Sequence, residues 1–175
     1  MRAILLLAPC ILVASCSGEA PAPEQSGIAG ADPLATPAAL PPQASDYPAL
    51  QSTECSEVAG FYFDAIAARD FARAALVWDD PVVDAARLEA LFSGYREPKF
   101  APGEAFEEGA AGSLYCTISG GLTDGADPDR ALRQGTLTLR RANDVPGATP
   151  DQLRWTIQES TFVESMERAG RGEPA

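Results

Sequence analysis

Few side chains in this sequence are suited to acid–base or metal chemistry. It has no histidine, so the usual proton shuttle near neutral pH and the commonest metal ligand are missing. Tyr62 and Asp64 could supply an acid and a base, but residues two apart on a helix point to opposite sides. Asp124, Asp127 and Asp129 lack the spacing and the final glutamate of a calcium-binding loop. We therefore predict neither a metal nor a cofactor, and we assign no catalytic residue.

Charge and composition restrict the partners. The 175 residues include 25 Asp and Glu against 13 Lys and Arg, a net charge of -12. Such a charge keeps a protein soluble and repels phosphate backbones, so we expect no nucleic-acid partner. Aromatic residues make up only 7% of the chain, which indicates a modest core within one domain.

The chain begins with a basic residue and an apolar run that is shorter than the roughly 20 residues of a membrane-spanning helix. The run ends in Val13, Ala14, Ser15 and Cys16, which resemble the lipobox of bacterial lipoproteins. The resemblance implies that residues 1–15 are a signal peptide and that Cys16 is lipidated. Ser17, where aspartate would retain the protein at the inner membrane, favours the outer membrane, facing the periplasm. A secretory signal without lipidation is the alternative.

Residues 16–50 form a separate block, rich in proline and alanine and without lysine or arginine. Without periodic apolar residues the block cannot bury a core, so we predict a disordered tether. A flexible coil of this length spans roughly 30 Å. The tether would hold a folded domain away from the membrane to which Cys16 attaches it.

The spacing of apolar residues predicts the helices and strands of the remaining chain. Three- and four-residue spacing predicts a helix from about residue 53, a second over 71–78 and a third after Pro81. Alternation then predicts strands around 114–118, 136–140 and 153–158, with a weaker strand over 104–110. Helices followed by strands indicate an α+β domain over residues 51–164. The Glu-, Arg- and Gly-rich residues 165–175 are predicted to be a frayed tail.

Residues 61–74 read FYFDAIAARDFARA and resemble the opening of nuclear transport factor 2-like domains, in which an aromatic-rich helix ends at a small-residue-plus-Asp turn before a second helix. This SnoaL-like or cystatin-like cone fold implies three N-terminal helices packed on one face of a curved antiparallel sheet of three to four strands. Cones of this type often hold a small ligand, and some members are isomerases or cyclases. The residues that would line such a pocket, or simply fill the core, are Tyr62, Ile66, Trp78, Tyr95 and Trp155.

The cysteines are predicted to have different roles. Cys10 would leave with the signal peptide, and Cys16 would carry lipid. Cys55 lies on the apolar side of the first predicted helix, and Cys116 shares a strand face with Leu114 and Ile118. Those surfaces meet when a helix packs on a sheet, so in an oxidising compartment we predict a disulfide between Cys55 and Cys116. Two buried reduced cysteines are the alternative.

The polar face of the predicted sheet is a candidate homodimer interface, as in this superfamily. It would consist of Thr117, Thr136, Thr138, Arg140, Arg154, Thr156 and Gln158. Threonine is also common in solvated strands, so an exposed face is the alternative.

Together these features predict a non-catalytic lipoprotein of the cell envelope, whose periplasmic domain binds a small apolar ligand or an envelope protein. A cone-type enzyme with acid–base chemistry and a purely structural envelope module are the alternatives.

Overall fold

The computed structural model describes residues 40–173. The predicted signal peptide, Cys16 and residues 17–39 of the predicted tether lie outside this range. No helix among residues 40–173 combines the length and the apolar character needed to cross a membrane.

Three α-helices precede the sheet: α1 (Cys55–Ala67), α2 (Phe71–Ala75) and α3 (Ala85–Phe92). Helix α1 ends at Ala67, and Arg69 in the turn that follows has a positive φ of 58°. Asp70 then caps α2 by accepting the backbone N–H of Arg73 at 3.1 Å, and Asp84 caps α3 in the same way. The short connection over residues 68–70 therefore keeps α2 in contact with α1.

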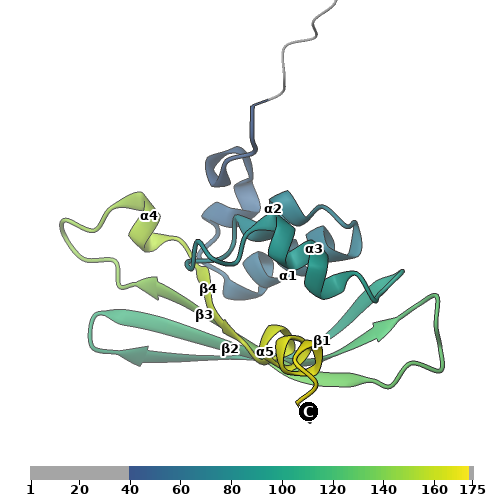
Figure 1. Cartoon of the computed structure of the whole chain (residues 1–175). Coiled ribbons are helices and arrows are strands. Elements are labelled where there is room, and N and C mark those ends of the chain that lie inside the picture. The colour runs from purple at the N-terminus through teal and green to yellow at the C-terminus, as the bar shows by residue number, and fades with distance from the viewer. Residues whose placement is uncertain (1–39, 174–175) are drawn as a thin grey trace, which may run out of the picture. The chain divides into compact units, whose positions relative to one another are not determined.

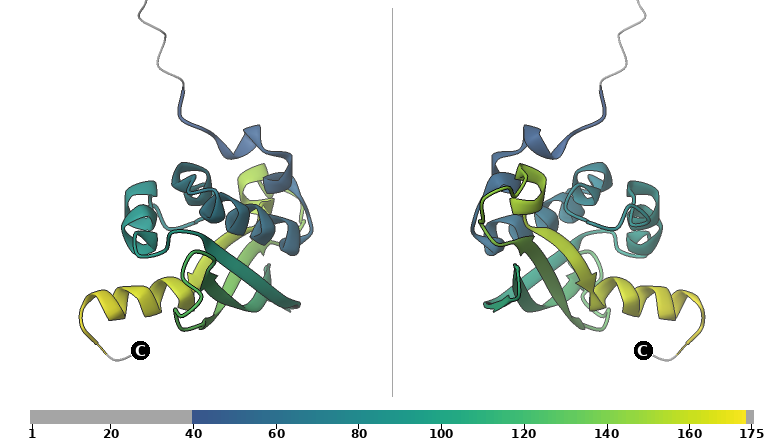
Figure 2. Two further views of the ribbon diagram at one scale, coloured as in Figure 1. Left: turned by 90° about the vertical axis from the view of Figure 1, so that its right-hand side faces the viewer. Right: turned by 90° about the vertical axis from the view of Figure 1, so that its left-hand side faces the viewer.

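Four strands form one antiparallel meander in the order β1-β2-β3-β4. They are β1 (Pro98–Ala110), β2 (Ser113–Asp124), β3 (Arg133–Ala142) and β4 (Thr156–Ser160). Ile118 pairs with Leu137, and Cys116 pairs with Leu139, so the apolar positions of β2 and β3 share one face. Helices α1, α2 and α3 gather on one side of this sheet (Figures 1 and 2). The predicted α+β architecture is therefore present, and the weak strand expected over 104–110 begins earlier, at Pro98.

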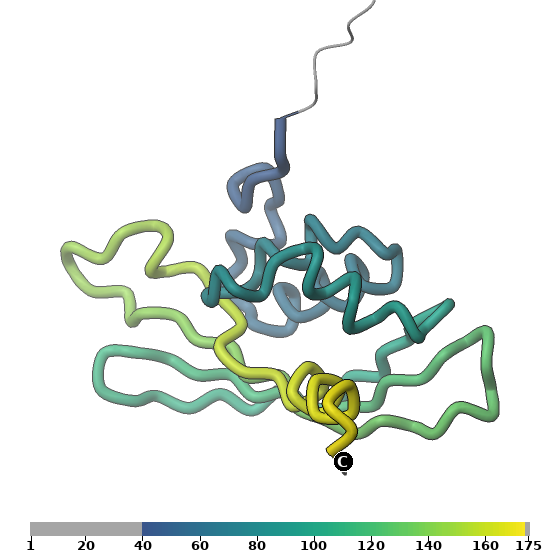
Figure 3. The backbone as a smooth tube through the Cα atoms, in the orientation of Figure 1, coloured from purple at the N-terminus to yellow at the C-terminus, as the bar shows by residue number. Residues whose placement is uncertain are grey.

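Two further helices flank β4 in the chain, α4 (Pro150–Leu153) before it and α5 (Thr161–Gly170) after it. The prediction of a frayed tail over 165–175 was wrong for residues 165–170, which belong to α5. Ser160 caps α5 by accepting the backbone N–H of Val163 at 3.4 Å. Phe162, Val163 and Met166 are buried at helical spacing, and this apolar contact fixes the helix. Figure 3 shows α5 as the yellow coil near the C-terminal end, beside the sheet.

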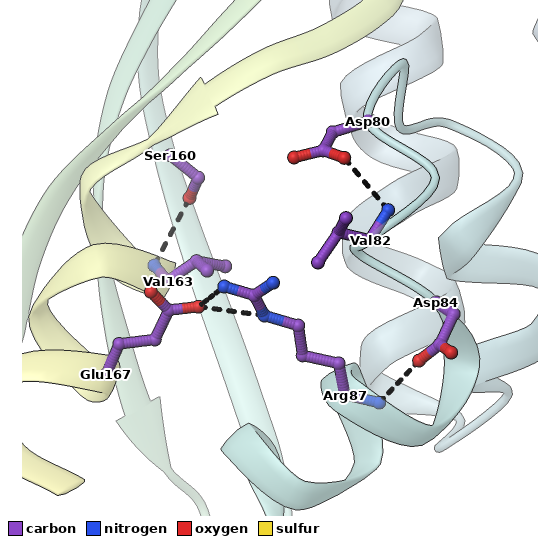
Figure 4. A network of polar contacts seen from close by, with 7 residues as sticks. All are labelled: Asp80, Val82, Asp84, Arg87, Ser160, Val163 and Glu167. Atoms are coloured by element: carbon purple, nitrogen blue, oxygen red, sulfur yellow. Dashed lines mark hydrogen bonds and ion pairs between the residues drawn. The ribbon is translucent and has the colours of Figure 1, made fainter. Parts of the chain in front are cut away.

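A polar contact joins α5 to α3. The Arg87 guanidinium donates to the Glu167 carboxylate, with 3.0 Å between Nε and Oε1. Figure 4 shows this pair between the two capped helix starts, Asp84 at α3 and Ser160 at α5. Each end of the contact is therefore on a helix whose first turn is held in place.

The folded body also begins earlier than predicted. Two short 3-10 helices, η1 (Ala44–Asp46) and η2 (Pro48–Gln51), lie within the segment predicted as tether. Leu50 is 0% exposed, and the Tyr47 ring packs edge-on against Phe61, with centroids 5.0 Å apart. Residues 40–50 are therefore attached to α1, because two large side chains among the prolines supply the burial that composition did not suggest.

Candidate functional site

The five predicted pocket residues belong to the core. Tyr62, Ile66, Tyr95 and Trp155 are at most 3% exposed, and Trp78 is half-buried with its ring 6.2 Å from that of Tyr62. The Trp155 indole N–H donates to the backbone oxygen of Thr53 at 2.8 Å, which joins the start of β4 to the residues before α1. These side chains fill the space beneath the helices and position the strands, so we find no ligand-lining role for them.

The ionisable groups of the interior do not form an acid–base pair. Burial raises the pKa of Tyr62 well above its ordinary value, so its phenol stays protonated at neutral pH. Asp64 is exposed on the opposite side of α1. The buried carboxylate among residues 40–173 is Asp124, at 3% exposure, and it lies at the end of β2 rather than beside Tyr62.

Asp124 organises the turn that follows β2. It accepts backbone N–H groups from Arg96 and Glu97 at 2.9 Å each and from Ala126 at 3.1 Å. These hydrogen bonds, that of Arg96 foremost, lower the pKa of Asp124. The carboxylate thus substitutes for missing backbone acceptors where β1 begins, and its role is structural.

The structure places a disulfide between Cys55 and Cys116, whose Cα atoms are 6.4 Å apart. It joins the first residue of α1 to the middle of β2, and both cysteines are buried. A carboxylate oxygen of Glu107 lies 3.3 Å from Cys55 Sγ. These three residues are the one grouping of candidate metal ligands within the described chain, but sulfurs bonded to each other are not the thiolates that bind metals.

The best candidate site is a surface recess of about 250 Å³ that we call the arginine recess. Three of its lining residues are Arg140, Arg141 and Arg154, and the aspartates Asp79 and Asp151 also line it. In a chain with a net charge of -12, three arginines at one small hollow are an unusual concentration of positive charge.

The ends of two strands bring these arginines together. Arg140 pairs with Thr156, the first residue of β4, so Arg141 extends past the end of that strand. Thr149 and Gln152 form a capping box that starts α4, and Arg154 follows this single turn as its C-cap. Helix α4 packs beside β3, and Arg154 therefore lines the same recess as Arg140 and Arg141, which lie fourteen and thirteen positions earlier.

Backbone and aromatic contacts hold each guanidinium. Arg154 Nη1 donates to the backbone oxygen of Leu76 at 2.9 Å, and Arg140 Nη2 donates to Ser113 Oγ at 2.8 Å. The Arg141 guanidinium lies over the Trp155 ring, 5.7 Å from its centroid. The recess is thus built on residues that the fold already fixes.

Sequence reasoning found part of this site. It placed Arg140 and Arg154 on a polar sheet face, but Arg154 precedes β4 and lines the recess instead. It missed Arg141, Asp79 and Asp151. The available signal was the Arg140–Arg141 pair, a doubled positive charge in an acidic chain.

The sheet face away from α1–α3 carries the other predicted residues. Thr117 pairs with Thr138 and with Phe106, whose side chain is 66% exposed. Thr136 instead contacts the first residue of α5, because its backbone N–H donates to Thr161 Oγ1 at 2.7 Å. Thr156 contacts the backbone oxygen of Arg140, and Gln158 is exposed.

No protein-family model matches this chain, and no curated protein matches it. Among solved structures, it is similar to a crystal structure from Thiobacillus denitrificans that is described as a calcium/calmodulin-dependent protein kinase type II association domain. The identity is 15% and the TM-score 0.41, over 60% of this chain and 90% of that one. A likeness at this level does not assign the chain to a family.

Proposed function

We propose that this protein is a non-catalytic lipoprotein of the cell envelope, whose domain has a nuclear transport factor 2-like fold and binds a small ligand at its surface. The order of elements supports the fold, because three helices precede a four-stranded antiparallel sheet. The sequence at Val13–Cys16 supports the anchor. Lipidation of Cys16 would place the domain in the periplasm, at the outer membrane.

The filled interior is the observation that supports a binding site on the surface. Tyr62, Ile66, Tyr95 and Trp155 occupy much of the space in which a cone would hold an apolar ligand, so we place the ligand at the surface. The arginine recess offers it a hollow with polar side chains on fixed elements. An isomerase- or cyclase-like reaction is disfavoured because Tyr62 is buried in the core and Asp64 is exposed on the opposite side of α1.

Mass spectrometry of the full-length protein, purified from its own envelope in a neutral detergent, tests both parts. We expect an amino-terminal Cys16 that carries acyl chains, lost in a Cys16→Ser variant. Native mass spectra should show the protein with a bound small molecule. An unmodified residue 16, or a chain without ligand from every preparation, would contradict the corresponding part of the proposal.

A homodimer through the open sheet face is the second candidate. Exposed Phe106 lies in this face, and the neighbouring row contains Glu108, Tyr115 and Arg140. A two-fold interface brings the same patch of both copies together, so Glu108 of each copy could meet Arg140 of the other.

The same native mass spectra report the oligomeric state. We expect a dimer that a Phe106→Glu substitution converts to monomer. Leu132→Glu, at a comparably exposed apolar residue of the β2–β3 loop, should leave the dimer intact. A monomeric wild-type protein would exclude this candidate.

A further inference from the structure

We infer that the arginine recess binds a compact oxyanion, the carboxylate or phosphate group of a small ligand. The inference rests on the proposed function, because it names the chemistry of the ligand that a surface-binding domain would take. It follows from the hydrogen-bonding state of the guanidinium groups, the charge around them and the size of the recess.

The three guanidinium groups carry far more N–H donors than the protein supplies acceptors for. Each carries five N–H groups in a planar fork. Within residues 40–173, each makes one hydrogen bond to the protein: Arg140 to Ser113, Arg154 to Leu76, and Arg141 to the backbone oxygen of Ala142 at 3.4 Å. The donors that remain match the oxygens of a carboxylate or phosphate, which arginine binds through pairs of parallel hydrogen bonds.

Arg154 adds a more specific observation. Its Nε is buried and has no hydrogen-bond partner in the described chain. A buried donor without an acceptor is destabilising, and most strongly so on a charged group. An oxyanion that enters the recess would provide the missing acceptor once the Arg154 side chain turns its Nε toward the recess.

The arginines of the recess form no ion pair within residues 40–173. The four ion pairs within residues 40–173 all involve other basic residues, namely Arg73, Arg87, Lys99 and Arg171. Arg140, Arg141 and Arg154 therefore line the recess without a carboxylate within 4.0 Å of their guanidinium nitrogens.

Asp79 and Asp151 restrict the size of the anion. Both are exposed residues of the recess, and they leave a formal excess of one positive charge over three arginines and two aspartates. They would repel an extended polyanion while leaving room for a single oxyanion group. The volume of about 250 Å³ also fits a compact group, since whole ligand pockets are generally about 300 Å³ or larger.

Isothermal titration calorimetry of the full-length protein in neutral-detergent micelles tests this inference. The probes are sodium phosphate and sodium succinate, with sodium chloride as the reference at equal ionic strength. We expect saturable one-to-one binding of phosphate, of succinate or of both. Binding of phosphate alone would identify a phosphate group, and binding of succinate alone would identify a carboxylate.

Variants locate the site. Arg154→Gln and Arg141→Gln should each weaken binding by about tenfold or more, as for the loss of a charged hydrogen bond. Arg168→Gln, on the exposed surface of α5, removes the same charge outside the recess and should bind like wild type. Arg141→Gln keeps the test valid if Arg154→Gln fails to fold, because its hydrogen bond is only to the adjacent residue.

The inference is overturned if neither probe binds more tightly than chloride, or if folded Arg141→Gln and Arg154→Gln proteins bind as wild type does. Its failure is separable from that of the proposed function. A neutral molecule found in the native mass spectra, together with no binding of either anion, would leave a surface-binding lipoprotein whose ligand is not an oxyanion.

Discussion

Opening the Cys55–Cys116 disulfide should strongly lower the free energy of unfolding. The bridge joins residues 61 positions apart. For a loop of this length the chain-entropy relation gives about 4 kcal/mol at 25 °C, because the cross-link restricts the unfolded chain. With a urea dependence of about 2 kcal/mol/M, the unfolding midpoint should fall by about 2 M. The measurement is urea unfolding of the chain from residue 16 with Cys16→Ser, with and without a thiol reductant, followed by circular dichroism.

A Cys55→Ala/Cys116→Ala variant provides the control. It should unfold near the midpoint of the reduced protein and should not respond to the reductant, which separates loss of the bridge from effects of the reductant itself. Alkylation of the wild-type protein without reductant should label neither cysteine. Two labelled thiols, or a reduced protein with an unchanged midpoint, would refute the reasoning.

Three other substitutions test features of the fold by the same urea unfolding. Leu50→Ala should destabilise the domain by about 2–5 kcal/mol, as a truncation of a fully buried leucine does. A change below about 0.5 kcal/mol would mean that residues 40–50 are part of the tether and not of the folded domain. Gly135→Ala should cost about 1–3 kcal/mol, since its Cβ would lie 2.7 Å from the buried Phe162 ring, and a neutral result would mean that α5 can shift. Asp124→Asn should destabilise at neutral pH. Folding lowers the pKa of Asp124, so the ionised carboxylate is the form that stabilises the fold. The stability difference between wild type and Asp124→Asn should therefore be constant above about pH 5 and shrink as the pH falls below about 4. A difference that grows in acid would refute that role.

The elements with regular apolar spacing could be predicted from sequence. In α1, Val58, Ala59, Tyr62 and Ile66 recur along one side, and in β2 and β3 apolar residues alternate. These patterns report burial directly, and burial decides the structure of such segments. The approach of Cys55 to Cys116 follows from the same faces, since the helix and the strand have to bury the surfaces that carry them.

The elements that the sequence did not predict have few buried residues, or buried residues that stand among polar ones. Leu50 is a single anchor among prolines, too isolated to make a pattern. In α5, the spacing of Phe162 and Met166 is present, but a glutamate between them and the glutamate and arginine that follow suggest a solvated tail. Strand β1 is exposed over most of its length, so it has no alternation, and its pairing with β2 becomes visible only in the fold.

The arginine recess illustrates a different limit. Arg140 and Arg141 are fourteen and thirteen positions from Arg154, and Asp79 is farther still. Their meeting depends on where β4 starts and on the single turn of α4, and an error of two residues in either boundary separates them. Sequence composition indicates that positive charge is rare here, but only the tertiary structure shows that it is concentrated.

The position of the disulfide also has a mechanical consequence. If the chain is anchored by lipid at Cys16, tension from the membrane enters the domain along the residues before α1 and reaches Cys55. The covalent bond then passes the force directly to β2 at Cys116, so residues 56–115 carry no load and cannot be extended while the bond is intact. At about 3.5 Å per residue this removes roughly 200 Å from the length to which pulling could stretch the chain. The helical layer would thus stay folded under a pull that opens the segments on either side of it.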